Sequence, residues 1–342
     1  MQWLSIMINS LFIENYRGIR HIEVLFAGNG SNIWIADAGA GKSTVVEMLY
    51  NLQVIARGAT VTQQVLVPTV QLSMSSSLAM NPMRCMLKMQ INGAALTYDL
   101  SVSVNSIVNR VEISRESLQR DGVCVFERQN GVVSLSSPTG DAGVVYPIEA
   151  NVFALTLPLF SQVGGPVSLF RSALSEAFIV RANYENVSDV VMPMRGYLDF
   201  NIGNFSTWIV NFLAAFPFAY EIVSGVMLRL MPDYQALNVH DAGGGMRRLA
   251  LKCARYHDPI PVSMLSRVEK MMLFVSAMCA VASVAPFEIL VWDDFLLGID
   301  CQLHEKMIKE LSNAFRRGQF FVLSSWSGDS GLSLSPVNIT RG

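Results

Sequence analysis

Charged residues are scarce in this chain. Lys, Arg, Asp and Glu make up 15% of its 342 residues, well below the roughly 25% usual for soluble domains. Because the mean hydropathy is +0.36, the composition excludes a disordered chain, and the shortage of charge excludes a long coiled coil. The formal net charge of −2 argues against a uniformly basic nucleic-acid coat but leaves a local basic patch open.

Closely spaced cysteines and an export signal are missing too. The N-terminal segment lacks the basic stretch and small-residue cleavage site of a signal peptide. No CxxC spacing occurs, so the sequence indicates neither a disulfide framework nor a zinc ribbon. We therefore expect a protein of the reducing cytoplasm. The five cysteines are Cys85, Cys124, Cys253, Cys279 and Cys301.

No hydrophobic run reaches the length of about 20 residues that a membrane helix needs. The stretch 208–220 is broken by Asn211 and Pro217, and the stretch 271–286 ends at a proline. We expect both stretches to be buried core helices, and we expect no membrane partner.

Hairpin patterns dominate the first half of the chain. The apolar segments LFIEN and HIEVLF flank the turn-like NYRG, which predicts an N-terminal β-hairpin. A strand over 33–36 and a helix over 43–52 follow. Alternating apolar residues then predict an antiparallel β subdomain over about 86–135. Its turns are expected at Asn92-Gly93, Asp121-Gly122 and Asn130-Gly131.

The second half of the chain has a different pattern. Residues 152–230 are apolar with helical spacing, and a run of three glycines at 243–245 ends this region. Strands and helices then alternate, which predicts a parallel sheet. The expected elements are strands over 246–253, 287–292 and 320–324 and helices over 266–284 and 301–316.

The stretch NIWIADAGAGKSTVVEML carries the clearest chemical signal. A phosphate-binding loop needs a strand, a turn of small residues, a lysine for the β- and γ-phosphates and a hydroxyl for Mg²⁺ at a helix N-terminus. Lys42 and Ser43 fit the last two requirements, whereas Ala36 replaces the usual first glycine. A Gly/Ala-rich turn with a solvated Lys42 is the alternative. The candidate ATP-binding residues are Asp37, Ala38, Gly39, Ala40, Gly41, Lys42, Ser43 and Thr44.

A second candidate segment, FEILVWDDFLLGID, supplies carboxylates. A nucleotide site needs an acid at the end of a neighbouring apolar strand to hold Mg²⁺. Asp293 would be that acid, together with Ser43 as the second metal-site residue, and Asp294 would polarise the attacking water. An ordinary acidic turn after a strand is the alternative.

With these residues identified, the chain resembles the ABC-type ATPases of the RecF, SMC and OLD-nuclease group, especially short bacterial ATPase heads. LFIENYRGIRHIEVLF is similar to their opening hairpin, ADAGAGKST to their Walker A and FEILVWDD to their Walker B. The segment Ile113-x-x-Glu116-x-Leu118 followed by FERQNG also matches. MLSRVEKMMLF resembles their signature motif, Gly298-Ile299-Asp300 their D-loop and VLSSWS their switch strand.

The resemblance implies an architecture and a partner. It implies a P-loop α/β head with a mixed sheet, an antiparallel β subdomain and a helical lobe. Two heads of this group sandwich two ATP molecules, so a homodimer is implied and a higher oligomer stays open. Ser266 would then contact the γ-phosphate in trans, and Asp300 would lie at the dimer seam. The implied divisions are 1–85 and 246–342 for the ATPase lobe, 86–150 for the β subdomain and 151–245 for a helical insert.

The chain departs from this group at three positions. Val268 replaces the signature glycine, Asp294 the catalytic glutamate and Trp326 the switch histidine in the nucleotide site. Val disfavours positive φ, Asp is one methylene shorter than Glu, and an indole cannot accept a hydrogen bond. We therefore expect ATP binding with slow hydrolysis, and Glu269 is the alternative catalytic residue. A misalignment of LSRVEK and SSWS by a residue or two would remove this argument.

Three functions follow. The first is an ATP-binding head that dimerises on nucleotide and regulates a separate effector protein such as a nuclease, in phage defence or the DNA-damage response. The second is a nucleotide-locked scaffold with little hydrolysis. The third, a transporter subunit, is disfavoured because transporter signatures follow the P-loop more closely than Ser266 follows Lys42.

DNA stays open as a partner. A cluster of basic residues precedes the signature-like segment and could contact a phosphate backbone, although a solvated strand face explains it as well. The cluster consists of Arg247, Arg248, Lys252 and Arg255.

Overall fold

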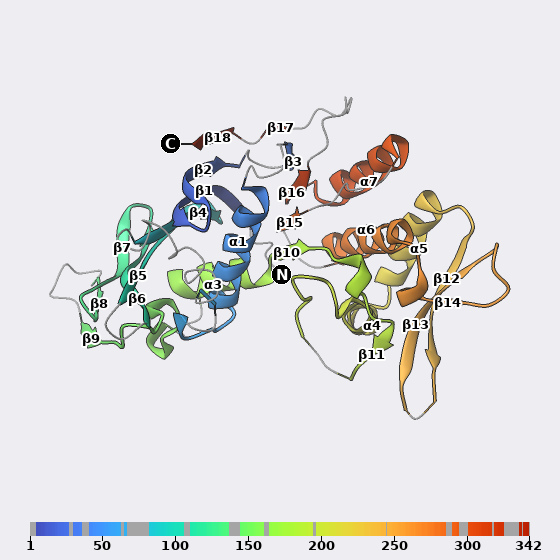
Figure 1. Ribbon diagram of the computed structural model, residues 1–342, viewed down its shortest axis with the longest axis horizontal. Coiled ribbons are helices and arrows are strands. Elements are labelled where there is room, and N and C mark those ends of the chain that lie inside the picture. Colours follow the sequence, from blue (N-terminus) through green and yellow to red (C-terminus); the bar gives the residue numbers. More distant parts are fainter. Residues whose placement is uncertain are drawn as a thin grey trace. The chain divides into compact units, whose positions relative to one another are not determined.

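The computed structural model divides the chain into two compact units (Figure 1). The first unit contains residues 1–32, 39–177 and 335–342, and the second contains 33–38 and 178–334. These boundaries differ from those of the four divisions expected from the sequence, which stay predictions. The structure describes residues 5–26, 30–35, 41–62, 65–66, 82–105, 110–136, 144–160, 164–193, 196–243, 245–284, 289–293, 300–316, 318–324, 335–336 and 338–341.

A nine-stranded antiparallel sheet forms most of the first unit. Its order is β18-β2-β1-β4-β5-β6-β7-β8-β9. The N-terminal hairpin and the predicted β subdomain therefore share one sheet, because β1 pairs with both β2 and β4. The strands are β1 Ile6–Tyr16, β2 Ile19–Leu25, β4 Met83–Ile91, β5 Ala94–Asn105, β6 Arg110–Arg120, β7 Val123–Gln129, β8 Val132–Leu135, β9 Val145–Pro147 and β18 Asn338–Arg341.

The three predicted hairpin turns are confirmed. Each is a two-residue connection in which both residues have positive φ, such as Asn92 at 52° and Gly93 at 82°. This is the geometry of a type I′ turn, whose twist matches that of the flanking strands. The same geometry occurs at Asp121-Gly122 and Asn130-Gly131.

Two helices complete the first unit, α1 Lys42–Ala56 and α3 Pro166–Glu176. The buried amide of Gln53 in α1 donates to the carbonyl oxygen of Leu174, 3.0 Å away, and also to that of Ala177. Arg57 adds a 3.0 Å hydrogen bond to the carbonyl oxygen of Ser175. Side chains near the end of α1 thus satisfy carbonyls that the end of α3 leaves without helical partners.

The second unit contains two of the three strands predicted to form a parallel sheet, whereas the strand predicted over 246–253 pairs antiparallel with its neighbours. The sheet order is β10-β15-β16-β3-β17, and β15 runs parallel to both β10 and β16. Every residue of β15 is buried, as expected for a strand covered on both faces. Of the strands in this sheet, β10 Phe178–Arg181, β15 Ile289–Asp293 and β16 Gln319–Ser324 belong to the second unit. Strand β3 Gly30–Ile35 crosses the division between the units, and β17 Ser335–Pro336 belongs to the first.

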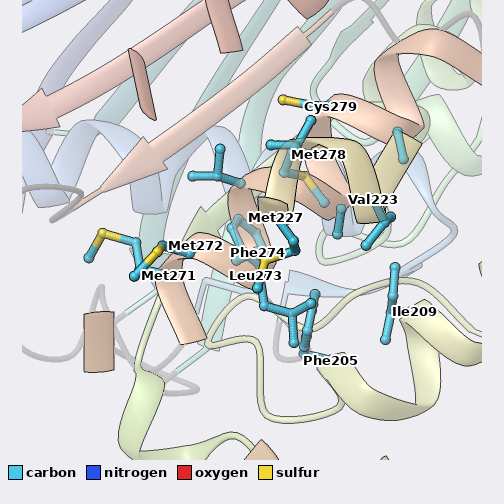
Figure 2. Close-up of a cluster of buried hydrophobic side chains, with 14 of the residues drawn as sticks. Phe205, Ile209, Val223, Met227, Met271, Met272, Leu273, Phe274, Met278 and Cys279 are labelled. Atoms are coloured by element: carbon cyan, nitrogen blue, oxygen red, sulfur yellow. The ribbon is translucent and has the colours of Figure 1, made fainter. Parts of the chain in front are cut away.

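Helix α6, Arg267–Val284, lies at the centre of the second unit's core (Figure 2). It is apolar almost all round, which is typical of a helix covered on every side. Figure 2 shows Leu273 and Phe274 of this helix near Phe205 of α4, and the ring centres of Phe205 and Phe274 are 5.6 Å apart. The surrounding helices are α4 Phe205–Ala215, α5 Ala219–Leu230 and α7 Cys301–Ala314.

A smaller antiparallel sheet completes the second unit, in the order β11-β13-β12, with β14 paired to β13. Its strands are β11 Val190–Val191, β12 Tyr234–Asp241, β13 Arg247–Cys253 and β14 Ile260–Pro261. Short 3₁₀ helices occur at Ala154–Thr156, Pro158–Phe160, Tyr184–Asn186 and Val262–Met264.

The prediction of a helical region over 152–230 is only partly right. Helices α3, α4 and α5 occur there, but Phe178–Arg181 forms β10, which pairs with β15. A short apolar run such as FIV fits a buried strand and a buried helix equally well by periodicity. The strand predicted over 33–36 also differs, because β3 begins earlier, at Gly30.

Among the described helices, none is both long and apolar enough to cross a membrane.

Candidate functional site

The phosphate-loop candidate lies in the first unit, at the start of α1. The helix begins at Lys42, directly after Gly41, whose φ is +85°. A Cβ on Gly41 would lie 3.1 Å from Cδ1 of Ile19. The position therefore requires glycine for its backbone conformation and leaves little room for a side chain. Asp37, Ala38, Gly39 and Ala40 lie outside the described residues.

The first turn of α1 is arranged to receive an anion. Gly41 makes no side-chain cap hydrogen bond, and the turn carries no acidic residue. The backbone N–H groups there and the helix dipole favour negative charge. Lys42 is buried with 8% exposure, and Ser43 and Thr44 follow it in the same turn. The described part of the motif therefore has the local structure that a phosphate-binding loop requires.

The NYRG turn contacts this same helix. Arg17 forms an ion pair with Glu47 of α1. The Tyr16 hydroxyl lies 3.4 Å from the Glu47 carboxylate and accepts a 2.9 Å hydrogen bond from Asn51. These contacts and the approach of Ile19 to Gly41 fix the N-terminal hairpin against the start of α1. The sequence analysis identified the turn but none of these contacts.

The candidate metal-site acid lies in the second unit. Asp293 is the last residue of β15, and its side chain is 1% exposed. Arg181, the last residue of β10, donates from Nε to Oδ2 of Asp293 at 3.0 Å. Oδ1 of Asp293 is buried without a hydrogen-bond partner among the described residues. Asp294 and Trp326 lie outside the described residues.

The signature-like segment forms the N-terminus of α6. The Ser266 backbone N–H donates to Oε2 of Glu269 at 2.7 Å, and the Glu269 N–H donates to the Ser266 hydroxyl at 3.3 Å. This is a capping box, in which Ser and Glu satisfy each other's backbone groups. Ser266 remains exposed, whereas Val268 packs partly buried against the core of the second unit.

Glu269, the alternative catalytic residue, has a second partner. Its carboxylate forms an ion pair with Arg255, which also contacts Asp233 at 3.1 Å. Burial lowers the pKa of Arg255, but the charges of Asp233 and Glu269 outweigh it, and the pKa is raised. Glu269 would have to leave both the cap and this ion pair before it could accept a proton from water.

Asp300 was predicted to lie at the dimer seam, and Lys270 follows Glu269 in the signature-like segment. Lys270 is buried and donates to the carbonyl oxygen of Tyr184 at 3.0 Å, and burial lowers its pKa. Asp300 caps α7 by accepting a 2.9 Å hydrogen bond from the N–H of Gln302. Both residues therefore have structural contacts within the second unit.

The basic cluster before the signature-like segment is largely paired. Arg248 lies 3.7 Å from Asp189, and Arg255 contacts two carboxylates. Lys252 donates to the carbonyl oxygens of Tyr256 and His257. Arg247 and Lys252 have no ion-pair partner among the described residues, so only two of the four cations in the cluster are neutralised by carboxylates.

The described residues contain no group of three or more His, Cys, Asp or Glu side chains that could hold a metal ion. A Mg²⁺ that binds through one carboxylate, a hydroxyl and nucleotide phosphates needs no such group.

Comparisons with known proteins agree with this arrangement at the level of the fold. No protein-family model and no curated protein matches the chain. Among solved structures, an SMC head bound to the C-terminal winged-helix domain of ScpA matches with a TM-score of 0.51 and 12% identity over 98% of both chains. The chain has the fold of an SMC head. The predicted fold, a P-loop head of the ABC type, is therefore confirmed.

Two further structures match with lower scores. A Pyrococcus furiosus SMC head bound to the C-terminal domain of ScpA has a TM-score of 0.49 and 11% identity, covering 93% of this chain and 89% of that one. The recombination mediator RecF bound to ATP has a TM-score of 0.44 and 10% identity, covering 99% and 98%. Both TM-scores are below 0.5, so the fold assignment rests on the first structure.

One site residue was missed by the sequence analysis. Arg181 directly follows the FIV run that was interpreted as helical, so nothing placed it beside Asp293. Had the run been interpreted as a parallel strand, the end of β10 would have been expected at the same sheet edge as the end of β15.

Proposed function

We propose that this chain is an ATP-binding ABC-type ATPase head. The observation that carries the proposal is the start of α1 at Lys42, directly after Gly41 in a left-handed conformation. Lys42 would bind the β- and γ-phosphates, and the N–H groups of the first turn would receive phosphate oxygens. The Gly41 backbone allows this approach because no side chain intervenes.

Ser43 and Asp293 would hold Mg²⁺. The unpartnered Oδ1 of Asp293 fits this role, because a buried carboxylate oxygen without a hydrogen bond is costly unless a ligand satisfies it. The metal would neutralise charge on the phosphates during hydrolysis. Asp294 would then orient the attacking water.

We further propose that nucleotide joins two copies of the chain. Ser266 is exposed at the N-terminus of α6 and would face the partner's γ-phosphate, with Asp300 at the seam. An SMC head of the same fold binds the winged-helix domain of ScpA. By analogy this head would regulate a separate effector in the cytoplasm, in phage defence or the DNA-damage response.

The competing function is a nucleotide-locked scaffold. It is favoured by Val268, which packs against the core of the second unit, and by Glu269, which is held by Ser266 and Arg255. Single-turnover ATP hydrolysis separates the two functions. A regulatory ATPase converts its bound ATP slowly, and Asp294→Asn lowers that rate while sparing binding. A scaffold leaves the bound ATP intact.

Thermal unfolding with and without Mg-ATP tests nucleotide binding. A ligand that binds only the folded state stabilises it by about 2.7 kcal/mol at a hundredfold excess over Kd. We expect Lys42→Ala to abolish this stabilisation and Lys88→Ala, on the exposed face of β4, to retain it. An equal shift in both variants would remove Lys42 from the nucleotide site.

Light scattering with a non-hydrolysable ATP analogue tests dimerisation. We expect the mass to double with the analogue, and Ser266→Arg to prevent the doubling. Ser134→Arg, at an exposed position of the first unit, is the control. A mass unaffected by nucleotide would contradict the sandwich.

A further inference from the structure

The ends of two neighbouring strands bring Arg181 and Asp293 together. Strands β10 and β15 are parallel, and their register pairs Val180 with Trp292 and Arg181 with Asp293. Both side chains therefore lie at the carboxyl-end edge of this sheet. Ligands of open α/β sheets bind outside that edge.

The contact between the two side chains is one-sided. Nε of Arg181 reaches only Oδ2 of Asp293, at 3.0 Å, whereas Oδ1 has no hydrogen-bond partner among the described residues. The aspartate side chain is 1% exposed and the arginine side chain 38% exposed. The guanidinium thus extends from a buried carboxylate towards solvent.

Arg181 is itself held in place. Its backbone N–H donates to the carbonyl oxygen of Phe200 at 2.8 Å, and its guanidinium carbon lies 6.0 Å from the centre of the Phe200 ring. A fixed guanidinium restricts rotation of the carboxylate about its last side-chain bond, because rotation would break the bond to Oδ2. The Oδ1 atom of Asp293 is therefore held in one orientation.

We propose that Arg181 is the positioning residue for Asp293: through its bond to Oδ2 it holds Oδ1 towards a Mg²⁺ bound at the end of β15. The inference rests on the proposed function and deepens it. Arg181 would act through Asp293, in the way that outer-shell hydrogen bonds orient metal ligands in other proteins.

Two effects of Arg181 on metal binding oppose each other. Its positive charge repels Mg²⁺, but the guanidinium is partly solvated and lies on the Oδ2 side, so this repulsion is screened. Without Arg181, Oδ2 of Asp293 would lose its hydrogen-bond donor, and the carboxylate would be free to turn away from the metal. We therefore expect loss of Arg181 to weaken metal binding.

The test compares Arg181→Met with Arg229→Met. Arg229 forms a two-contact ion pair with Glu310 in the same unit, at 2.6 and 2.8 Å, without Asp293. Binding of a fluorescent ATP analogue is measured in EDTA and across a Mg²⁺ titration, and Mn²⁺ affinity of the nucleotide complex is measured by electron paramagnetic resonance. We expect Arg181→Met to lower metal affinity about 10–100-fold and to leave binding in EDTA unchanged, with no effect of Arg229→Met.

Two more variants keep the inference testable if Arg181→Met folds poorly. Arg181→Lys retains the charge without the planar fork, so we expect an intermediate loss of metal affinity. In Asp293→Asn, adding Arg181→Met should cause no further loss, because the neutral amide needs no cation.

The possible failures are distinguishable. If the wild type binds no nucleotide, the proposed function fails, and the role of Arg181 fails with it. If Lys42→Ala abolishes binding but Arg181→Met leaves metal affinity unchanged or tighter, only the role of Arg181 is overturned. An equal loss in EDTA and in Mg²⁺ would also overturn it, because a purely structural ion pair has that effect.

Discussion

Glu116 and Arg128 lie buried at the centre of the first unit, whereas the centre of the second unit is the apolar helix α6. The Glu116 carboxylate accepts hydrogen bonds from the Tyr98 hydroxyl at 2.9 Å and from the N–H groups of Ala154 and Leu155 at 2.7 and 2.8 Å. Arg128 lies 4.0 Å from it and donates to the carbonyl oxygen of Glu149 at 2.8 Å. In the second unit, α6 makes its contacts through Met, Leu, Phe and Cys side chains.

The two centres respond differently to substitution for a physical reason. A buried polar network is favourable only while each member keeps its partners. An apolar core has no directional bonds, so it tolerates changes of shape when volume is kept. We therefore expect substitutions at the centre of the first unit to lower its stability strongly, even when they keep the side chain's shape. At the centre of the second unit, substitutions that keep the volume should lower stability only a little.

Breaking the polar centre should have the largest effect. Glu116→Ala leaves the guanidinium of Arg128 buried without its carboxylate and removes the acceptor from two backbone N–H groups. We expect a loss of about 3–5 kcal/mol of unfolding free energy, measured by urea denaturation. The control is Glu127→Ala, which breaks an exposed ion pair with Arg115 and should change stability by less than about 1 kcal/mol. Equal losses would show that the network is not the source.

Changing the apolar centre tests its tolerance. Met278 is fully buried in α6, so Met278→Ala should cost about 2–5 kcal/mol through the cavity it leaves. Met278→Leu keeps most of the volume and should cost less than about 1.5 kcal/mol. In the first unit, Glu116→Gln is equally close in shape, but its amide NH₂ group would face a backbone N–H donor of Ala154 or Leu155, so we expect it to be poorly tolerated. Similar losses for Met278→Leu and Glu116→Gln, by urea denaturation, would contradict the comparison.

Substitutions at two glycines of the first unit distinguish the effect of backbone strain on stability from an effect on nucleotide binding. Gly41 and Gly122 have φ values of +85° and +79°, but only Gly41 has an atom within 4 Å of an added Cβ. Replacing either with Ala should cost about 1–2 kcal/mol of stability through its left-handed backbone. Only Gly41→Ala should also weaken Mg-ATP binding in a thermal-shift titration. Weaker binding in Gly122→Ala would mean that strain alone is responsible.

The pH dependence of the two units should differ in sign. Burial raises the pKa of Glu116, despite the hydrogen bonds that oppose it, so its contribution is present at low pH and is lost as pH rises through the folded pKa. Burial lowers the pKa of His304 from its ordinary 6.5, so its contribution is present above 6.5 and is lost as pH falls through the folded pKa. His304→Gln should flatten the loss of stability between about pH 7 and pH 5.

The exposed residue His257, whose side chain is 98% exposed, provides the matched control for this smallest effect. Urea midpoints measured across the same pH range should be unchanged by His257→Gln. A flattening by both variants would assign the pH dependence to general charge effects.

Local patterns predicted most of the first unit. The Asn-Gly and Asp-Gly turns fixed the hairpins because their two central residues must have positive φ. The start of α1 was predicted within a residue, because the lysine and hydroxyl of a phosphate loop stand at a helix N-terminus. Glu116 was identified only through resemblance, since nothing in the local sequence indicates that Arg128 and the residues after 149 would enclose it.

Long-range contacts were beyond the sequence. Arg181 and Asp293 are 112 residues apart, and their contact depends on β10 being a strand rather than part of a helix. The pattern Ser266-x-x-Glu269 was visible, but it was interpreted as catalytic chemistry and not as a capping box. Local rules give elements, whereas the partners of a buried charge depend on how those elements pair.

Because β18 pairs with β2, one edge of the N-terminal hairpin stays open while most of the chain is translated. Asn338 of β18 is opposite Leu25 of β2, so the edge of an early hairpin is completed by residues translated much later. At about 5–20 residues per second, this edge would wait for tens of seconds on the ribosome. Arg20 and Glu23 lie beside its apolar residues, and charges of this kind discourage a foreign strand from pairing there. A nascent chain of this protein therefore has an open edge at β2 until β18 emerges.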